Sequence, residues 1–384
     1  SWGAEAGLSN NDDRTTSGCG YAAAGEGTHM SAKRVTLADV ARTAGVSSST
    51  ASLVMTGRGH ELRISEAVQH RVRDTAQQLG YRPNNISIGL RKGATRTIGF
   101  VSDTVASSQL AGDMIKGAIG AARDRGYMLF MTETGGGPAQ ERKAIETMLD
   151  HRVDGLLLAS MFTRRREELP AELAQIPAVL LNSLPPDGQP LAALVPDEHA
   201  AGRAAAEFLV TAGHRKIHLI GAGLSPTENI AASAAADLRL QGILEGLDDA
   251  GIAPVSGHAY RSWNPQHGWE AVHELIEQGT PPAALICFND RLAFGAYQAL
   301  QEAGRRIPDD CSIISFDDST LAGWLRPGLT TFAIPHRTLG ATAVDLLISA
   351  VEDPQGHPLR PVISRRDMPL RERGSVAQGI TEDR

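Results

Sequence analysis

From Thr97 onward the chain alternates short apolar runs with stretches of helical periodicity, and this alternation constrains the fold more than any other feature. The apolar runs are Ile98–Val101, Met128–Met131, Gly155–Ala159, Val179–Leu181, Ile217–Ile220, Ala284–Phe288 and Ile313–Phe316. The helical stretches are 112–125, 139–150, 199–212, 239–250, 267–278, 291–303 and 337–351. Continuous apolar strands separated by helices indicate parallel sheets covered on both faces. Because there are more such units than one ordinary sheet holds, we predict two sequential α/β subdomains with a cleft between them.

Residues 36–80 follow a different pattern, that of three short helices. Thr36 and Ser47 are candidate N-caps of the first two helices, and Gly45 breaks the chain between them. A third helix is expected to start near Ser65 and to end at a C′ glycine. A helix, a glycine-containing turn, a second helix and a supporting helix make up the helix-turn-helix arrangement. We therefore predict a small all-α headpiece in front of the α/β body.

Charge is distributed unevenly between these two parts. Residues 31–96 hold 11 Lys and Arg against 4 Asp and Glu, so the rest of the chain, with 26 against 40, is acidic. A basic segment suits phosphate binding, because each neutralised phosphate releases counterions. A helix surface that only faces solvent can carry the same excess, so charge alone leaves both interpretations open.

The N-terminal segment and the cysteines bear on location. Residues 1–32 are rich in small polar residues, which predicts a disordered extension, and Met30 is a candidate native start. They contain no apolar core of a secretory signal, and no stretch approaches the about 20 apolar residues that cross a bilayer. The three cysteines have no ligand spacing. We therefore expect a reduced, cytoplasmic protein without a membrane segment, and buried Cys287 and Cys311.

Enzyme signatures are weak. Gly221-Ala222-Gly223 follows a predicted strand but lacks the third glycine of a dinucleotide-binding fingerprint. The loop Gly135–Pro138 lacks the lysine and hydroxyl residue of a P-loop. The 12 histidines form no ligand cluster. We therefore expect neither an enzyme nor a cofactor or metal site.

Polar residues follow several of the predicted strands. They are Ser102-Asp103, Asn182-Ser183, Asn289-Asp290 and Asp317-Asp318. Ligands of parallel sheets bind beyond the carboxyl ends of the strands. Trp263 is a candidate stacking platform, and Arg239, near a helix start, could donate a forked pair of hydrogen bonds. Carboxylates and amides beside an aromatic ring suit a polyhydroxylated ligand such as a sugar. The same residues could instead only cap helices, and composition leaves that alternative open.

Several longer segments follow one another along the chain in an order that is itself informative. They are Val35–Ser47, Thr50–Ser52, Leu79–Asn84, Val195–Asp197, Ala212–Ile217, Asn289–Gly295, Ile307–Asp309, Phe316–Asp318 and Leu329–Thr331. Together they resemble the lac-repressor (LacI/GalR) family of transcription factors, over roughly residues 33–373. The chain would then comprise the extension 1–32, a DNA-binding headpiece 33–82, a hinge 83–96, an effector-binding and dimerisation core 97–373 and a tail 374–384. The core would be of the periplasmic-binding-protein-like type.

The resemblance implies which residues contact DNA. The second helix would enter the major groove with Ser48, Ser49 and Leu53 towards base edges. Leu90, in a hinge that folds as a helix on the operator, would wedge into the minor groove. The full set is Thr36, Ser47, Ser48, Ser49, Thr50, Ser52, Leu53, Asn84 and Leu90. Two serines and a leucine make no bidentate base contact, so readout would depend on thymine methyls, water and DNA shape.

The resemblance also implies an effector site in the core. The matching positions are Asp103, Asn182, Arg239, Trp263, Asn289 and Asp317. We therefore expect a transcriptional regulator, most simply a repressor, that binds a palindromic operator as a homodimer, with a tetramer left open. A small molecule, expected to be a sugar, would close the cleft and shift the two amino-terminal subdomains of the dimer against each other.

Two other functions share the predicted body. A sugar-binding receptor of the periplasmic type would have the same pair of subdomains, but the basic headpiece and the missing signal peptide count against it. A sugar-metabolising α/β enzyme would need a nucleophile or metal constellation that the sequence lacks. Location outside the cytoplasm would favour the first, and turnover of candidate sugars the second.

Overall fold

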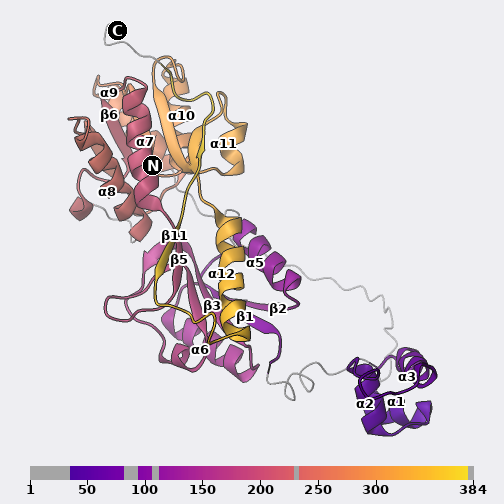
Figure 1. The fold of residues 1–384 in the computed structure, drawn as a ribbon. Coiled ribbons are helices and arrows are strands. Elements are labelled where there is room, and N and C mark those ends of the chain that lie inside the picture. The colour runs from indigo at the N-terminus through magenta and orange to yellow at the C-terminus, as the bar shows by residue number, and fades with distance from the viewer. Residues whose placement is uncertain (1–34, 82–93, 106–111, 229–232, 379–384) are drawn as a thin grey trace, which may run out of the picture. The chain divides into compact units, whose positions relative to one another are not determined.

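The protein divides into two compact units, residues 1–84 and 85–384, which are described separately (Figure 1). A computed structural model describes residues 35–81, 94–105, 112–228 and 233–378. The predicted extension 1–32, the hinge residues Asn84 and Leu90 and the last six residues lie outside these ranges.

The headpiece consists of three helices, as the sequence predicted. They are α1 (Leu37–Ala44), α2 (Ser48–Met55) and α3 (Glu66–Gln78). Thr36 caps α1 through a capping box, in which its side chain accepts the N–H of Asp39 and the Asp39 carboxylate accepts the N–H of Thr36. Ser47 Oγ accepts the N–H of Thr50 at 3.0 Å and caps α2. Both predicted N-caps are therefore confirmed.

Glycine ends two of these helices in the left-handed conformation. Gly45 follows α1 with φ +65°, and the N–H of Val46 then bonds to the carbonyl of Ala41 at 3.0 Å. Gly80 follows α3 with φ +66°. A side chain would make this conformation costly by about 1–2 kcal/mol. The tight turn at Gly45 lets the three helices share one apolar core, which contains Val40, Ala41, Ala44, Ala51, Val54, Val72 and Ala76.

The first part of the larger unit is a six-stranded, all-parallel sheet with the order β11-β5-β4-β3-β1-β2, which we call the N-terminal subdomain. Its strands are β1 (Thr97–Ser102), β2 (Met128–Glu133), β3 (Gly155–Arg165), β4 (Ala178–Leu184), β5 (Ala193–Pro196) and β11 (Ile363–Arg366). Its helices are α5 (Gly112–Asp124), α6 (Pro138–Asp150), α12 (His336–Glu352) and the short η1 (Ala171–Gln175). Figure 1 shows α12 and α5 together on one face of this sheet and α6 on the other.

The second part, the C-terminal subdomain, has a six-stranded sheet with the order β12-β10-β9-β8-β6-β7, in which only β12 is antiparallel. Its strands are β6 (Ile217–Gly221), β7 (Ser256–Ala259), β8 (Ala284–Cys287), β9 (Ser312–Asp317), β10 (Thr330–Ala333) and β12 (Leu370–Arg371). Its helices are α7 (Glu198–Thr211), α8 (Ala234–Asp248), α9 (Pro265–Glu277), α10 (Asp290–Glu302), α11 (Thr320–Trp324) and η2 (Pro226–Glu228).

The predicted pair of parallel α/β sheets is therefore present, and every apolar run predicted as a strand is one. The strands that were not predicted, β5, β7, β10, β11 and β12, are two to four residues long, too short for a periodic signal. Helix α8 begins at Ala234 rather than at residue 239. Three consecutive alanines open it, and alanine favours helix without marking an apolar face.

The chain passes between the two subdomains three times. It crosses from β5 to α7, which packs on β8 and β9, and returns from β10 to α12, which packs on β3, β4 and β5. It crosses again from β11 to β12. The N-terminal subdomain therefore contains a helix and an edge strand from the last fifth of the chain, and neither subdomain is a continuous segment.

Residues 374–378, assigned to a tail from the sequence, run beside β9. Ser375 Oγ donates to the carbonyl of Ile313 at 2.6 Å and accepts the N–H of Thr330 at 2.8 Å. Ser375 and Val376 are buried. Residues 374–378 therefore form hydrogen bonds with backbone groups of β9 and β10, and they belong to the packed body rather than to a tail.

Three helix pairs in the body cross through glycines. In each pair, a Cβ on either glycine would overlap backbone atoms of the other helix. The pairs are α5 with α12 (Gly117 and Gly340), α7 with α8 (Gly202 and Gly242), and α9 with α10 (Gly268 and Gly295). The helices approach so closely that only hydrogen fits at the crossing.

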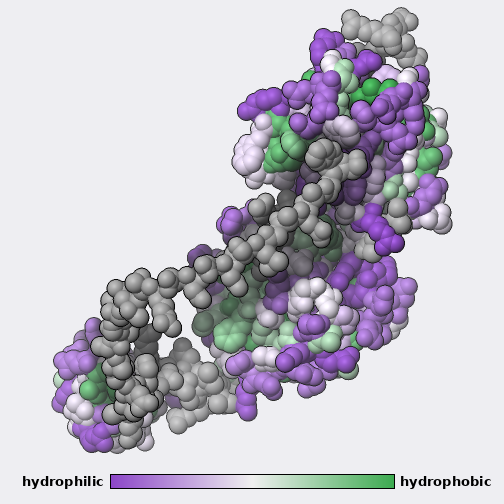
Figure 2. Space-filling model, turned by 180° about the vertical axis from the view of Figure 1, so that it is seen from behind, coloured by the Kyte–Doolittle hydropathy of each residue, from purple (hydrophilic) through white to green (hydrophobic). Residues whose placement is uncertain are grey.

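One edge of the N-terminal sheet is apolar and exposed. Strand β2 is its edge strand, and Met128, Phe130 and Met131 on it are exposed, Met128 by 62%. Ile119, on the neighbouring helix α5, is exposed as well. Figure 2 shows hydrophobic residues gathered on this side of the lobe that holds the N-terminal sheet. Exposed apolar edges of this kind mark surfaces that pair with another chain.

Candidate DNA-binding and effector-binding sites

The outer surface of α2 carries the residues predicted to read DNA. Ser48 and Ser49 are exposed, and Ser52 and Leu53 are partly exposed, while the other face of the helix packs into the headpiece core. Their spacing places the four on one side of the helix. The helix contains no charged residue. No acidic side chain of α2 therefore repels an anion at its N-terminus, where the free N–H groups and the helix dipole favour a phosphate.

The other predicted contacts in the headpiece also hold its turns. Thr36 Oγ1 donates to Asp39 Oδ2 at 2.7 Å, and the hydroxyls of Ser47 and Thr50 are hydrogen-bonded at 2.8 Å. One of the Ser47 and Thr50 hydroxyls keeps a proton that it can donate to a phosphate, whereas the single O–H of Thr36 is donated to Asp39. These side chains therefore fix the starts of α1 and α2 and lie where the same N-termini can meet DNA.

Among the described residues of the body, three of the five non-glycine residues with a positive φ lie in the last part of a strand or directly after one; the other two are Arg96 and Arg152. Asn182 in β4 has φ +54°, and Asp317 and Asp318 at the end of β9 have φ +120° and +52°. Each such conformation costs a non-glycine residue about 1–3 kcal/mol, and such residues cluster at functional sites. Two of the three are residues predicted from the sequence to contact the effector.

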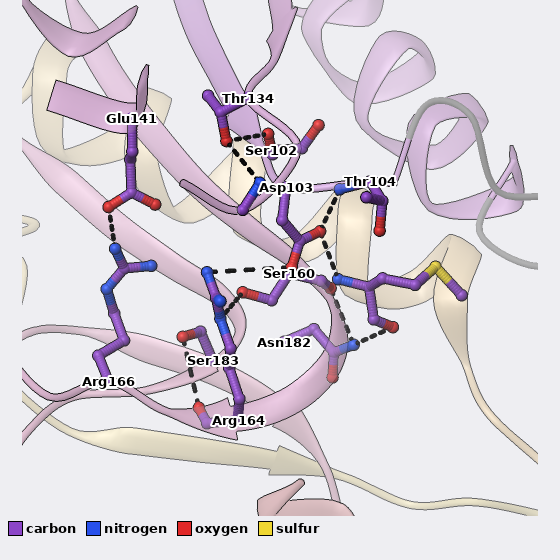
Figure 3. Close-up of polar contacts among 12 residues, drawn as sticks. Ser102, Asp103, Thr104, Thr134, Glu141, Ser160, Arg164, Arg166, Asn182 and Ser183 are labelled. Atoms are coloured by element: carbon purple, nitrogen blue, oxygen red, sulfur yellow. Dashed lines mark hydrogen bonds and ion pairs between the residues drawn. The ribbon is translucent and has the colours of Figure 1, made fainter. Parts of the chain in front are cut away.

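Asp103 lies at the centre of a polar cluster in the N-terminal subdomain (Figure 3). Its Oδ1 accepts the N–H of Met161 at 2.9 Å and that of Thr104 at 2.5 Å. Its Oδ2 lies 3.9 Å from a guanidinium nitrogen of Arg164, a long ion pair. One carboxylate oxygen thus holds the backbone, and the other is available to a ligand.

Asn182 supports this cluster from below (Figure 3). Its Oδ1 accepts the Thr163 hydroxyl at 2.6 Å, and its Nδ2 donates to the carbonyls of Ser160 and Met161, each at 3.0 Å. These bonds span the irregularity in β3, where the pairing with β4 shifts between Ala159 and Arg164. Asn182 thereby fixes the bulge, and the bulge turns Arg164 towards Asp103.

Arg239 is a buried residue of helix α8 in the C-terminal subdomain. It is 2% exposed, and its Nε and Nη2 donate to one oxygen of Glu198 at 3.0 and 2.5 Å, while Nη1 donates to the carbonyl of Phe288. Its guanidinium lies 4.1 Å from the centre of the Phe316 ring. The forked pair of hydrogen bonds predicted for a ligand is therefore directed at Glu198 in this structure. Because α8 begins earlier than expected, Arg239 lies in its second turn.

Trp263 and Asn289 meet beside Arg239. The indole N–H of Trp263 donates to the carbonyl of Gly221 at 2.9 Å, and its ring lies edge-on to Phe288 with centres 5.6 Å apart. Asn289 donates to the carbonyl of Trp263 at 3.2 Å and caps α10 through the N–H of Leu292. The capping alternative thus applies to Asn289, which also holds the Trp263 segment in place.

Asp317 is the acidic residue of this group. Burial raises its pKa well above the usual range, the Asp290 carboxylate raises it further, and Arg239 opposes the shift. Burial also raises the pKa of Asp290, although that carboxylate accepts bonds from Ser315, Thr331 and Ser319. Asp317 lines a cavity of about 470 Å³ that also contains His336. Burial lowers the pKa of His336 to about 4.

The predicted effector residues thus form two groups, one in each subdomain, and the subdomains touch where Ser233 Oγ donates to the carbonyl of Thr163 at 3.3 Å. Sequence reasoning missed Arg164 and Glu198, and it named Asp290 only as one of the polar residues that follow the strands. A run of three arginines at the end of a strand was a usable signal for Arg164. Nothing in the sequence marked Glu198, because its partner Arg239 lies far away in the chain.

Metal ligands, thiols and helix lengths in the described parts of the chain also bear on function. No group of three potential metal ligands occurs among the described residues. Cys287 and Cys311 are buried, as predicted, and burial raises the pKa of both thiols, which disfavours a nucleophilic thiolate. Within the same residues, no helix is long and apolar enough to cross a membrane.

Comparison with known proteins identifies the family to which this architecture belongs. Residues 36–84 match the model of bacterial regulatory proteins of the lacI family, and residues 206–376 match that of a periplasmic binding protein-like domain. Over 338 residues the chain is 31% identical to the ribose operon repressor of Escherichia coli K12, covering 86% of this chain and 98% of that protein. The chain belongs to the lacI family.

Other lacI-family proteins agree. The repressor PurR of Vibrio atlanticus is 31% identical over 83% of this chain and 92% of its own. A lac repressor dimer bound to operator and the anti-inducer ONPF superposes with a TM-score of 0.76 at 26% identity, covering 90% of this chain and 100% of that one. The regulator CelR in complex with cellobiose gives 0.60 at 26% identity, over 89% and 100%. The predicted family and fold class are confirmed, and these lacI-family relatives are transcriptional regulators, not enzymes.

Proposed function

We propose that this lacI-family protein is a cytoplasmic transcriptional repressor whose affinity for a palindromic operator is set by a carbohydrate in the cleft of its core. One observation carries the proposal. A headpiece with an uncharged, exposed recognition helix is joined to a body in which polar side chains gather at the strand ends of two subdomains. We assign residues 33–82 to the headpiece, 83–96 to the hinge and 97–378 to the core.

For DNA, we propose base contacts by Ser48, Ser49 and Leu53, and phosphate contacts by the hydroxyls around the helix N-termini. The supporting residues are Thr36, Ser47, Thr50 and Ser52, with Asn84 and Leu90 added from the sequence alone. A helix surface of serines and one leucine supplies few strong base contacts. Much of the specificity would then come from DNA shape and from the spacing that the dimer imposes.

For the effector, one relative is named for the ribose operon and another structure is a complex with cellobiose. We propose that Asp103, Arg239, Trp263, Asn289 and Asp317 contact a carbohydrate. Free carboxylate oxygens of Asp103 and Asp317 would accept hydrogen bonds from the hydroxyls of the sugar, and the Trp263 ring would lie against the apolar face of the sugar. Asn182 would act through the β3 bulge, since its own side chain is fully engaged.

Dimerisation follows from the exposed edge of the N-terminal sheet. Met128, Phe130 and Met131 on β2 and Ile119 on α5 form an apolar surface, and a lac repressor relative is a dimer on its operator. A second copy of this chain on that surface would place two headpieces at a fixed spacing. Cleft closure about the three crossings would rotate the N-terminal subdomains against each other and change that spacing.

Two measurements test the proposal. Selection from a genomic fragment library should give a palindromic site at physiological salt, and a failure to enrich any site would refute DNA recognition. Thermal shift against a carbohydrate panel should give a hit that Trp263→Ala and Arg239→Ala weaken. A hit that both variants retain unchanged would show that the pocket lies elsewhere.

The hinge has its own test. Leu90→Ala should weaken operator binding by about tenfold or more and non-specific binding much less, because wedging needs the bent specific complex. The measurement is a gel shift on operator and on scrambled DNA at equal salt. Equal losses on both would contradict the wedge.

A further inference from the structure

A cavity of about 360 Å³ lies in the N-terminal subdomain, between the start of α6 and the segment that follows β3. Four arginines line it, Arg142, Arg164, Arg165 and Arg166, together with three glutamates, Glu141, Glu167 and Glu168. Residues 164 and 166 alternate along an extended segment that continues to pair with β4, so they share one face. Figure 3 shows Arg164 and Arg166 extending from this segment beside Asp103 and Glu141.

The lining keeps an excess of one positive charge, four arginines against three glutamates. The Arg166 guanidinium is paired with Glu141, both nearly buried at 8% and 12% exposure, while Arg142 lies 3.8 Å from Glu172 and Arg165 lies 3.0 Å from Asp187. Among the described residues, Arg164 has only one ion pair, the long 3.9 Å pair with Asp103, and its Nε donates to the Ser160 hydroxyl at 3.1 Å.

A buried donor is also left over. Within the described residues, the Nε of Arg166 is buried and has no hydrogen-bond partner. A buried N–H without a partner is costly, and native proteins normally satisfy it with water or a ligand.

The N-terminus of α6 adds to this positive character. The helix is 13 residues long, its N-cap is Gly137, and no side chain caps it among the described residues. The N–H groups of Ala139 and Gln140 have no intrahelical acceptor, whereas Pro138 has no N–H and the N–H of Glu141 bonds to the carbonyl of Gly137. The helix dipole makes this end favourable for an anion. Pro138 and Glu141 of the first turn line the cavity, so an oxyanion there would meet both the helix end and the arginines.

The cavity continues from the proposed effector site. Gly135 donates its N–H to the carbonyl of Asp103 at 2.9 Å, and the Arg164 guanidinium touches both the cavity and the Asp103 carboxylate. On the basis of the proposed function, we propose that the effector is an anionic carbohydrate whose phosphate or carboxylate binds among Arg164, Arg166 and the start of α6. Asp103 then holds a neighbouring hydroxyl, and the sugar extends towards the C-terminal subdomain.

Titration calorimetry on the full-length protein tests this. The probes are inorganic phosphate, ribose and ribose 5-phosphate, and glucose with glucose 6-phosphate and glucuronate. Two variants remove the site, Arg164→Gln and the paired Glu141→Gln/Arg166→Gln, which removes both charges at once and leaves no unpaired buried ion. Arg360→Gln is the control, an exposed arginine outside the cavity. The phosphate and carboxylate arms distinguish the two anions.

We expect one anionic sugar to bind at least about tenfold more tightly than its neutral parent, as one or more charge-assisted hydrogen bonds would give. Both cavity variants should abolish that advantage and leave the affinity of the parent unchanged, and the control should keep both. Anionic sugars that bind no better than their parents, or an advantage that survives both variants, would overturn the proposal.

Operator binding separates this failure from failure of the proposed function. If a neutral sugar changes operator affinity and its phosphate or acid binds no more tightly, the anion site is refuted and the repressor function stands. If inorganic phosphate binds in an Arg164-dependent manner but no sugar changes operator affinity, the anion site is supported and the proposed carbohydrate control is refuted.

Discussion

The buried ion pair between Arg239 and Glu198 allows a quantitative prediction. Both side chains are 2% exposed, so Arg239→Met leaves a buried carboxylate without its counter-ion. Removing one partner of such a pair costs about 3–5 kcal/mol. Replacing both partners, as in Glu198→Leu/Arg239→Met, removes the charge altogether, and apolar replacements of buried pairs are commonly neutral or stabilising by about 1–4 kcal/mol. The carbonyl of Phe288 loses its donor in either case, at about 1 kcal/mol.

We therefore expect the double variant to be at least about 2 kcal/mol more stable than Arg239→Met alone. The assay is urea unfolding followed by tryptophan fluorescence. Trp263, Trp269 and Trp324 all belong to the C-terminal subdomain, so the signal reports the part that contains the pair. Both variants should lose binding of the proposed effector, because both lack the guanidinium.

A double variant no more stable than the single one would refute the reasoning. The cost of Arg239→Met would then come from lost packing against Phe316 rather than from the stranded carboxylate. Phe316→Leu serves as a check, since it removes the ring under the guanidinium and keeps the pair.

Three further predictions concern backbone and titration. Gly45→Ala should destabilise the headpiece by about 1–2 kcal/mol, because φ is +65° at this position. Thermal melting and operator binding measure the effect. An unchanged melting point would contradict a left-handed conformation at Gly45. Gly242→Ala should cost the core about 3 kcal/mol, because its Cβ would overlap the carbonyl of His199, whereas Gly120→Ala, with nothing within 4 Å, should stabilise by about 0.5–1 kcal/mol. Urea unfolding followed by far-UV circular dichroism, which reports both subdomains, measures the two variants, and similar effects at both sites would disprove the close crossing. The pKa of His336 is about 4 in the folded protein against 6.5 ordinarily, so the unfolded chain binds more protons between these values and stability falls as pH falls. Between pH 7 and pH 5 the protein should lose about 2 kcal/mol that His336→Phe does not lose, and parallel pH profiles of the two proteins would count against a buried neutral imidazole.

The sequence predicted the elements well and their contacts poorly. Thr36, Gly45 and Ser47 identify helix ends through chemistry that acts within a few residues, so the headpiece could be derived from local rules. The long apolar strands could be derived for the same reason. Strands of four residues or fewer, such as β7 and β11, have no local signature and exist because a neighbouring strand pairs with them.

The site shows the same division. Asp103, Asn289 and Asp317 could be named because polar residues after buried strands fall at one edge of a parallel sheet. Glu198 could not, since its partner Arg239 is distant in the chain and the pair forms only when α7 packs on α8. Asn182 was expected to face a ligand and instead spans the β3 bulge, an irregularity with no sequence pattern.

The three crossings between subdomains also bear on how the protein is made. Helix α12 supplies Leu339, Val344 and Leu347 to the core of the N-terminal subdomain, and β11 completes its sheet. During synthesis, which proceeds from the N-terminus, that subdomain cannot finish folding until the ribosome has released almost the whole chain. The headpiece has no such dependence and can fold first. A chain terminated before residue 336 would therefore leave a folded DNA-binding headpiece attached to a body that cannot respond to any effector.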